Sequence, residues 1–144
     1  MVAAAAGERL TIILYMILLE YEVWTHVVHR TGRSQVIEYV RRLPKRDRAK
    51  IHTYIRMLRE RQGYLGEPYA RHIIGSIREL RVDFGRTRHR VFFFTHIKRR
   101  IVLLSAFTKD TPKTPVREIE RAQDAFQDVI NNHAYEKASE DGQF

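Results

Sequence analysis

One stretch of the sequence, residues 71–117, carries the whole net charge of the chain and has the pattern of a small antiparallel sheet. It contains 12 Lys and Arg residues against 3 acidic residues, so its charge of +9 equals that of the whole chain. A positive field concentrated on one small sheet is typical of a protein that binds a phosphate backbone. A solvated basic face is the plainer interpretation of the same charge.

Length and composition place the chain among ordinary globular proteins. Its 144 residues suit one domain, and 44% of them are hydrophobic and 30% charged. The chain has no cysteine, which excludes disulfides and thiolate metal sites and agrees with a reducing cytoplasm. The pI near 10.2 indicates nucleic acid, the ribosome or an acidic protein as the partner class.

The longest apolar run, residues 10–19, is too short to cross a bilayer, which takes about 20 residues. The run follows Glu8-Arg9 rather than a basic cluster, and no small-residue cleavage site comes before Trp24, so we expect no signal peptide. Part of the run is expected to join the first strand. Residues 1–15 would then be an accessory extension, with Met16 as an alternative start.

Strand and helix periods alternate along the following part of the chain. Residues 17–28 are rich in β-branched and aromatic side chains and predict a strand. Ser34 is placed to cap a short helix that Pro44 stops. Residues 45–61 repeat apolar side chains at helical spacing and carry basic ones on the other side. The two helices therefore predict a hairpin with a basic exterior.

Three further strands and a helix are predicted after a loop that ends at Gly75. Residues 77–84 alternate apolar and charged side chains, which predicts a strand with one solvated face. Residues 88–96 and 101–107 continue it as a meander. Residues 115–132 have helical spacing with a proline in the first turn, and the polar tail at residues 133–144 is expected to be flexible.

The predicted order is therefore β-α-α-β-β-β-α, which is an α+β fold. A helical hairpin and a C-terminal helix are expected to pack on one face of a curved, mainly antiparallel sheet. We expect one domain over residues 16–132, between the accessory extension at residues 1–15 and the tail at residues 133–144.

Several motifs follow one another in the charged segment. They are Glu-Leu-Arg at residues 79–81, Arg-Val at residues 90–91, Phe-x-Lys at residues 107–109 and Lys-Thr-Pro at residues 113–115. Together with the predicted helical hairpin, these motifs closely resemble the HigB-like toxins of the RelE/ParE superfamily, which belong to bacterial and phage toxin–antitoxin systems. The resemblance covers about residues 21–125.

This resemblance implies a ribosome-dependent endoribonuclease that cuts messenger RNA, inhibits translation in the cytoplasm and is silenced by a helix-turn-helix antitoxin. The implied chemistry uses no metal or other cofactor. The RNA 2′-hydroxyl attacks the neighbouring phosphate and leaves a 2′,3′-cyclic phosphate and a 5′-hydroxyl, which requires a base, an acid and cations around the transition state. The expected partners are the antitoxin, the ribosome and messenger RNA, with no membrane and no small-molecule ligand.

The resemblance also implies which arginines would hold the scissile phosphate. Arg81 stands at the arginine of the Glu-Leu-Arg strand, where its planar guanidinium suits two phosphate oxygens. Arg90 would be its partner on the next strand. The alternative for either arginine is an ion pair with Glu79 or Asp83.

Two lysines and one histidine complete the implied catalytic group. Lys109 and Lys113 stand in the Phe-x-Lys and Lys-Thr-Pro motifs, where lysine would neutralise the transition state or protonate the leaving oxygen. The alternative is that Lys113 is only a surface charge at the start of the last helix, without a catalytic role. His72, in the predicted loop, is the candidate base because histidine titrates near neutral pH. Asp110 departs from the lysine frequent at this position in such toxins, which removes one cation.

Other basic residues of the segment are predicted to bind RNA, together with one aromatic side chain. Phe92 and Phe94 share one side of their strand with Arg88 and Arg90, so a phenylalanine there could stack on a splayed base. Core filling is the plainer interpretation of three successive phenylalanines. The predicted RNA-binding residues are Arg71, Arg88, Phe92, Lys98, Arg99 and Arg100.

The remaining histidines are not expected to be catalytic or metal-binding. His89 should point away from Arg88 and Arg90, toward the helices, and pack there. His26 and His29 lie near the end of the first strand without an acidic or cysteine partner, so no metal site is expected.

Two functions of other classes remain open at this stage. The basic sheet could serve a non-catalytic adaptor that binds nucleic acid or protein. The chain could also resemble the ParE branch of the superfamily, which poisons DNA gyrase. A shared fold does not decide between them, because function resides in the site.

Overall fold

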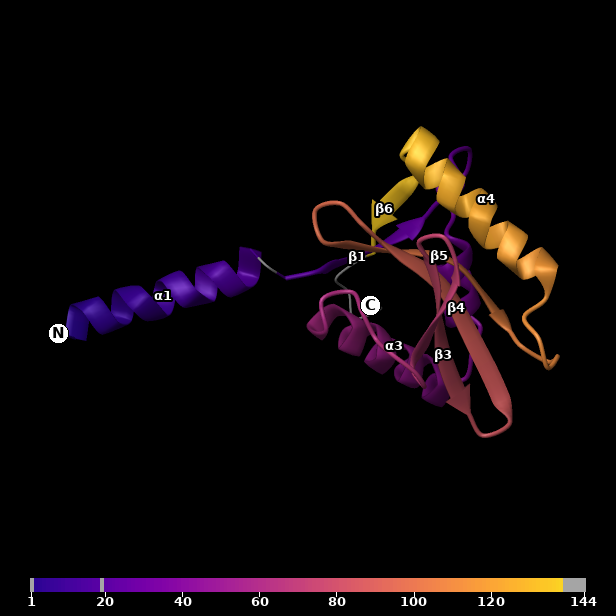
Figure 1. The fold of residues 1–144 in the computed structure, drawn as a ribbon, viewed down its shortest axis with the longest axis horizontal. Coiled ribbons are helices and arrows are strands. Elements are labelled where there is room, and N and C mark those ends of the chain that lie inside the picture. Colours follow the sequence, from indigo (N-terminus) through magenta and orange to yellow (C-terminus); the bar gives the residue numbers. More distant parts are fainter. Residues whose placement is uncertain (1, 19, 139–144) are drawn as a thin grey trace.

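The computed structural model describes residues 2–18 and 20–138, which form an α+β fold around a six-stranded sheet (Figure 1). The strands are β1 (Glu22–His26), β2 (Ala70–Ile74), β3 (Ile77–Phe84), β4 (Thr87–His96), β5 (Arg100–Thr108) and β6 (Tyr135–Lys137). The helices are α1 (Val2–Leu18), α2 (Gln35–Arg41), α3 (Lys45–Glu60) and α4 (Val116–Asn132). The predicted fold class is confirmed.

The sheet is mixed, with the strand order β2-β3-β4-β5-β1-β6. Strands β2 to β5 form an antiparallel meander. The sequence predicts the part from β3 to β5, and the structure adds β2. β1 lies parallel to β5, and β6 adds to β1 in the antiparallel direction. The two longest strands, β4 and β5, therefore lie in the middle of the sheet.

Helices cover both faces of the sheet, and each face has its own core. The α2–α3 hairpin packs on one face around residues such as Ile55 and Phe93, and we call this the hairpin face. α4 covers the other, the α4 face, around residues such as Phe94 and Leu104. The prediction that the helices share one face is wrong. Because β4 carries three successive phenylalanines, it places aromatic rings on both faces, and both need cover.

The helical hairpin begins as the sequence indicates. Ser34 caps α2, since its hydroxyl accepts a hydrogen bond from the backbone N–H of Ile37 at 3.2 Å. The same hydroxyl lies 2.6 Å from the hydroxyl of Thr25 on β1, so the cap is also tied to the sheet. Pro44 separates α2 from α3.

The apolar run near the N-terminus is helical rather than extended. α1 continues to Leu18 and β1 begins only at Glu22, so the prediction of a strand from residue 17 is wrong; residue 19 lies outside the described residues. Alanine and leucine, which favour helices, are frequent in α1. α1 projects from the sheet with the side chains of residues 5–15 exposed (Figure 1). Within residues 2–18 and 20–138, no helix is long and apolar enough to cross a membrane.

The sequence pattern misses two short strands. β2 lies in the predicted loop and pairs with β3 at the edge of the sheet. Most of its side chains are exposed, so its sequence lacks the alternation of buried and exposed residues that predicts a strand. β6 lies in the predicted tail, and Tyr135 packs its ring against Trp24 with centroids 5.2 Å apart. The expectation of a flexible tail is therefore wrong for Tyr135–Lys137, and residues 139–144 lie outside the described residues.

Replacing Phe93 by alanine should lower the free energy of unfolding by about 3–5 kcal/mol, because its ring is fully buried on the hairpin face. The control Ile97→Ala, at an exposed position, should change it by less than about 0.5 kcal/mol. Urea denaturation followed by circular dichroism measures both. Equal losses would contradict the two-faced core described above.

Candidate functional site

A buried carboxylate, that of Glu79 on β3, is the centre of a charged cluster on the α4 face. The Glu79 side chain is 2% exposed, and its Oε1 lies 3.4 Å from Arg90 Nε and 3.8 Å from Arg81 Nε. Arg81 and Arg90 stand directly opposite each other on β3 and β4, as predicted. The prediction of a solvated polar face is wrong at Glu79, because this carboxylate is enclosed by its partners.

Arg90 is an internal member of this cluster rather than an exposed one. Its side chain is 1% exposed, and its Nη1 donates to Asp83 Oδ1 at 2.6 Å and to the backbone oxygen of His89 at 2.9 Å. The alternative interpretation, pairing with Glu79 or Asp83, therefore describes what Arg90 does. A ligand could reach Arg90 only after local rearrangement.

Arg81 is more accessible than Arg90. Its side chain keeps 24% of its surface exposed, and its Nε makes no hydrogen bond to the described residues. The backbone N–H of Arg81 donates to the oxygen of Tyr69 at 2.8 Å, which holds β3 beside the start of β2. Arg81 is therefore the arginine of the pair that is placed to contact an anionic ligand.

Lys109 follows directly after β5 and its charge is influenced by the same cluster. Its backbone N–H donates to the oxygen of Arg88 at 2.8 Å. Burial lowers the pKa of the Lys109 ammonium below its ordinary value of 10.5, and the carboxylate of Glu79 opposes this shift. The positive charges of Arg90, Arg81 and Arg88 lower the pKa further. Lys109 therefore loses its proton more readily than an ordinary lysine, which suits proton transfer.

The Lys-Thr-Pro segment reaches the cluster through its threonine. Thr114 donates its hydroxyl to Glu79 Oε2 at 3.1 Å, whereas Lys113 is exposed. Sequence reasoning assigned no role to Thr114 and treated Glu79 only as an alternative ion-pair partner. Their signal was present in the Glu-Leu-Arg and Lys-Thr-Pro motifs, because each motif supplies one end of this hydrogen bond.

The predicted base does not lie with the arginines. His72 is on strand β2 rather than in a loop, and it stands opposite Arg78, whose partner on β4 is the hairpin-face residue Phe93. The sheet therefore separates His72 from the cluster, and His72 Nε2 lies 2.8 Å from the backbone oxygen of Gly75. Its neighbour Arg71 is exposed and pairs with Glu67 at 2.9 Å.

The basic turn at residues 98–100 lies at the other end of β4 from Arg90. Arg100 stacks on Trp24 at 4.4 Å and donates to the hydroxyl of Tyr135 at 2.7 Å, so it joins β5 to β1 and β6. Lys98 and Arg99 are exposed in the turn. The structure therefore divides the predicted RNA-binding residues between two ends of the sheet.

Phe92 offers no surface for base stacking. Its ring is fully buried on the α4 face, 5.5 Å from the ring of Phe107. The plainer interpretation, core filling, is thus the one that the structure shows. Arg88, also predicted to bind RNA, is partly exposed at the cluster end of β4.

The histidines outside the cluster are held by polar partners. His89 is packed on the hairpin face as predicted. The expectation that His26 lacks an acidic partner is wrong, because its Nε2 lies 2.7 Å from Asp128 Oδ2 on α4. Among the described residues, no group of three or more His, Asp or Glu side chains is placed to hold a metal ion.

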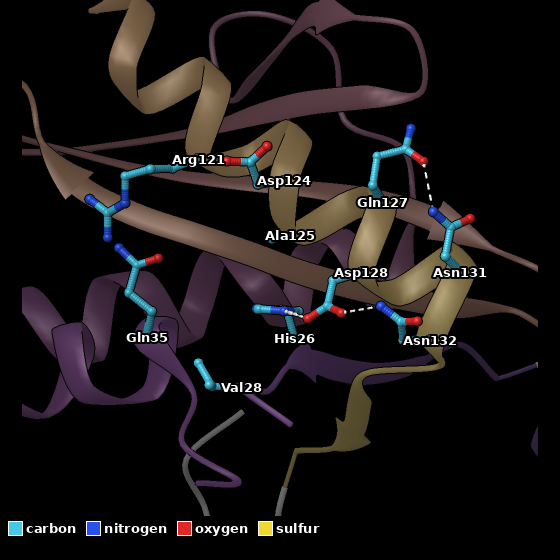
Figure 2. Close-up of a pocket in the computed structure, with 10 residues that line it drawn as sticks. All are labelled: His26, Val28, Gln35, Arg121, Asp124, Ala125, Gln127, Asp128, Asn131 and Asn132. Carbon is cyan, nitrogen blue, oxygen red and sulfur yellow. Dashed lines mark hydrogen bonds and ion pairs between the residues drawn. The ribbon is translucent and has the colours of Figure 1, made fainter. Parts of the chain in front are cut away.

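The His26–Asp128 pair lines a groove of about 600 Å³ between α4, the end of β1 and the start of α2 (Figure 2). Hydrogen bonds from Asn132 and His26 lower the pKa of the Asp128 carboxyl. Gln35 borders the groove from α2 and donates to the backbone oxygen of Ala106 at 3.3 Å. These contacts fasten α4 and α2 to the sheet.

The sequence pattern of one protein family, described as Phage derived protein Gp49-like (DUF891), matches residues 38–127. The match runs from within α2 to within α4 and so includes the charged cluster. This family is related to the RelE/HigB-like toxins, which supports the resemblance at the level of the toxin superfamily. Among curated proteins, none matches the chain.

The Lys109 ammonium should titrate below its ordinary pKa of 10.5, and Glu79→Gln should lower that pKa further, because it removes the one charge that opposes the shift. Arg81→Ala should raise the pKa toward its ordinary value. NMR titration of the lysine side-chain signals measures all three proteins. An unchanged pKa in both variants would show that Lys109 is electrostatically independent of the cluster.

Proposed function

We propose that this chain, which belongs to the Phage derived protein Gp49-like family, is the toxin of a type II toxin–antitoxin system and cleaves messenger RNA on the ribosome. The observation that carries the proposal is the cluster around Glu79. It brings Arg81, Arg90 and Lys109 together at one end of the sheet, and one of the three has a lowered pKa.

The cluster supplies two of the elements that RNA cleavage by the 2′-hydroxyl requires. Arg81, the more accessible arginine of the pair, binds the non-bridging oxygens of the scissile phosphate and stabilises the charge of the transition state. Lys109 donates a proton to the leaving 5′-oxygen, because its lowered pKa makes the ammonium a stronger acid than that of an ordinary lysine. Arg90 and Glu79 hold these two side chains in place from within the sheet.

The ribosome is the proposed setting because the cluster presents few groups to its substrate. Arg90 is already engaged by two carboxylates, and His72 lies beyond the sheet. Contacts made elsewhere must therefore orient the RNA strand for in-line attack. The exposed cations at Lys98 and Arg99, at the far end of β4, suit such contacts with phosphates.

A binding adaptor without catalysis is the second candidate. The observation that favours it is the pairing of Arg90 with Glu79 and Asp83, because such ion pairs also occur in proteins that only bind. Under this alternative, Arg81→Ala weakens binding and removes no cleavage.

Brief induction of the chain should stop growth and create new 5′ ends within coding regions, only while those messages are translated. Arg81→Ala should lower the cleavage rate by about 10²–10³, because it removes the accessible phosphate donor. Lys98→Ala removes one remote phosphate contact and should cost little beyond a shallower salt dependence of ribosome binding. Sequencing of 5′ ends with and without a translation inhibitor measures this. Equal losses in both variants would favour the adaptor. DNA-damage signalling with intact messages would indicate a gyrase poison.

A helix-turn-helix protein encoded beside this gene should restore growth on co-expression and form a stable complex with the chain. If the antitoxin buries apolar surface, the complex should survive high salt, while ribosome binding, which depends on phosphate contacts, should weaken. Size-exclusion chromatography and ribosome sedimentation at rising salt measure the two interactions. Growth unaffected by the chain without any partner would contradict the toxin assignment.

A further inference from the structure

Directly behind the cluster, on the hairpin face, four polar side chains form a continuous hydrogen-bonded chain. Asp47 Oδ2 on α3 lies 2.6 Å from His89 Nε2 on β4, and His89 Nδ1 lies 2.7 Å from the hydroxyl of Tyr39 on α2. That hydroxyl lies 2.7 Å from the hydroxyl of Thr108, the last residue of β5. This network of hydrogen bonds therefore joins both helices of the hairpin to the two central strands.

The direction of the hydrogen bond between Asp47 and His89 follows from the chemistry of its two members. The Asp47 carboxylate accepts, so His89 Nε2 donates to it. Burial raises the pKa of the Tyr39 hydroxyl, which a hydrogen bond with Thr108 opposes and the charge of Asp47 reinforces. Tyr39 therefore keeps its proton, and its hydroxyl has two hydrogen-bond partners, His89 Nδ1 and the Thr108 hydroxyl. Each hydroxyl and both imidazole nitrogens of the network have a partner.

This hydrogen-bonded network contains two residues that stand opposite each other in the sheet. His89 stands opposite Thr108, and the residues that follow them in sequence are Arg90 and Lys109. Because side chains alternate along a strand, fixing His89 and Thr108 from the hairpin face sets the direction of Arg90 and Lys109 on the α4 face. His89 is 1% exposed, so its place is fully determined by packing and these bonds.

We propose that Asp47, His89, Tyr39 and Thr108 are positioning residues, through which the helical hairpin holds Lys109 in its buried place beside Glu79. The inference rests on the proposed function for its catalytic consequence, since Lys109 is there the acid. The Thr108 hydroxyl is the critical link. It sits at the end of β5, immediately before Lys109, where the strand leaves the sheet.

Thr108→Val tests the link with little change of shape, Thr108→Ser retains the hydroxyl, and Thr87→Val on β4 is the control at another exposed threonine. Thr108→Val should move the Lys109 pKa back toward 10.5 in an NMR titration, because Lys109 leaves its buried place. On programmed ribosomes it should lower the single-turnover cleavage rate about 10- to 100-fold with unchanged ribosome affinity. Thr108→Ser and Thr87→Val should match the wild type, and Tyr39→Phe should reproduce Thr108→Val.

The two measurements separate this inference from the proposed function. A wild-type protein that cleaves no message while Thr108→Val still shifts the Lys109 pKa would overturn the proposed function and retain the positioning role. The positioning role would be overturned if Thr108→Val kept the Lys109 pKa and the cleavage rate of the wild type. It would also be overturned if Thr108→Ser were as defective as Thr108→Val. Thermal melting of each variant checks the fold. If Tyr39→Phe unfolds, Thr108→Val, at an exposed site, decides the outcome.

Discussion

The burial of the Glu79 carboxylate constrains this structure more than any other single interaction. A charge removed from water is strongly destabilising unless it is paired and hydrogen-bonded. Here the compensation comes from Arg90 across the strands, Arg81 on the same strand and the hydroxyl of Thr114 beyond β5. Satisfying Glu79 therefore fixes the register of β3 against β4 and draws the segment before α4 onto the sheet.

The two faces of the central strands perform different tasks because β4 and β5 are buried on both sides. Facing the hairpin, the hydrogen-bonded network that starts at Asp47 lies beside an apolar core. Facing α4, apolar packing around Phe94 gives way to the charged cluster toward one end of the strands. A rigid double core of this kind suits a site whose charged groups must not move apart.

The sequence predicts the parts of this fold that depend on local patterns. The cap at Ser34, the helical stripe of α3 and the bounds of β3 follow from neighbouring residues alone. The side of the sheet that α4 covers, and the burial of Glu79, depend on contacts between distant segments, and alternation alone marks Glu79 as solvated. For the same reason, local sequence patterns do not predict the pairing of His26 with Asp128, which is 102 residues away.

The site itself was partly predictable in the same sense. The motifs indicate Arg81, Arg90 and Lys109. The structure brings these residues together, because they lie on, or directly after, neighbouring strands of one meander. The motifs do not reveal that Arg90 is enclosed, nor that β2 turns His72 to the other face. How exposed a side chain is, and to which face it points after a turn, depend on the complete sheet.

The mutual repulsion among Arg81, Arg88, Arg90 and Lys109 has a consequence for the evolution of this protein. Burial is the largest cause of the lowered pKa of Lys109, and the positive charges of Arg90, Arg81 and Arg88 lower this pKa further, so these like charges act against one another in the folded state. A substitution that removes the charge of Arg88, which takes no part in the ion pairs of Glu79 given above, would relieve part of this repulsion and favour the folded chain. Under the proposed function, the same substitution would weaken phosphate binding, so selection for function and selection for stability would act in opposite directions on this residue.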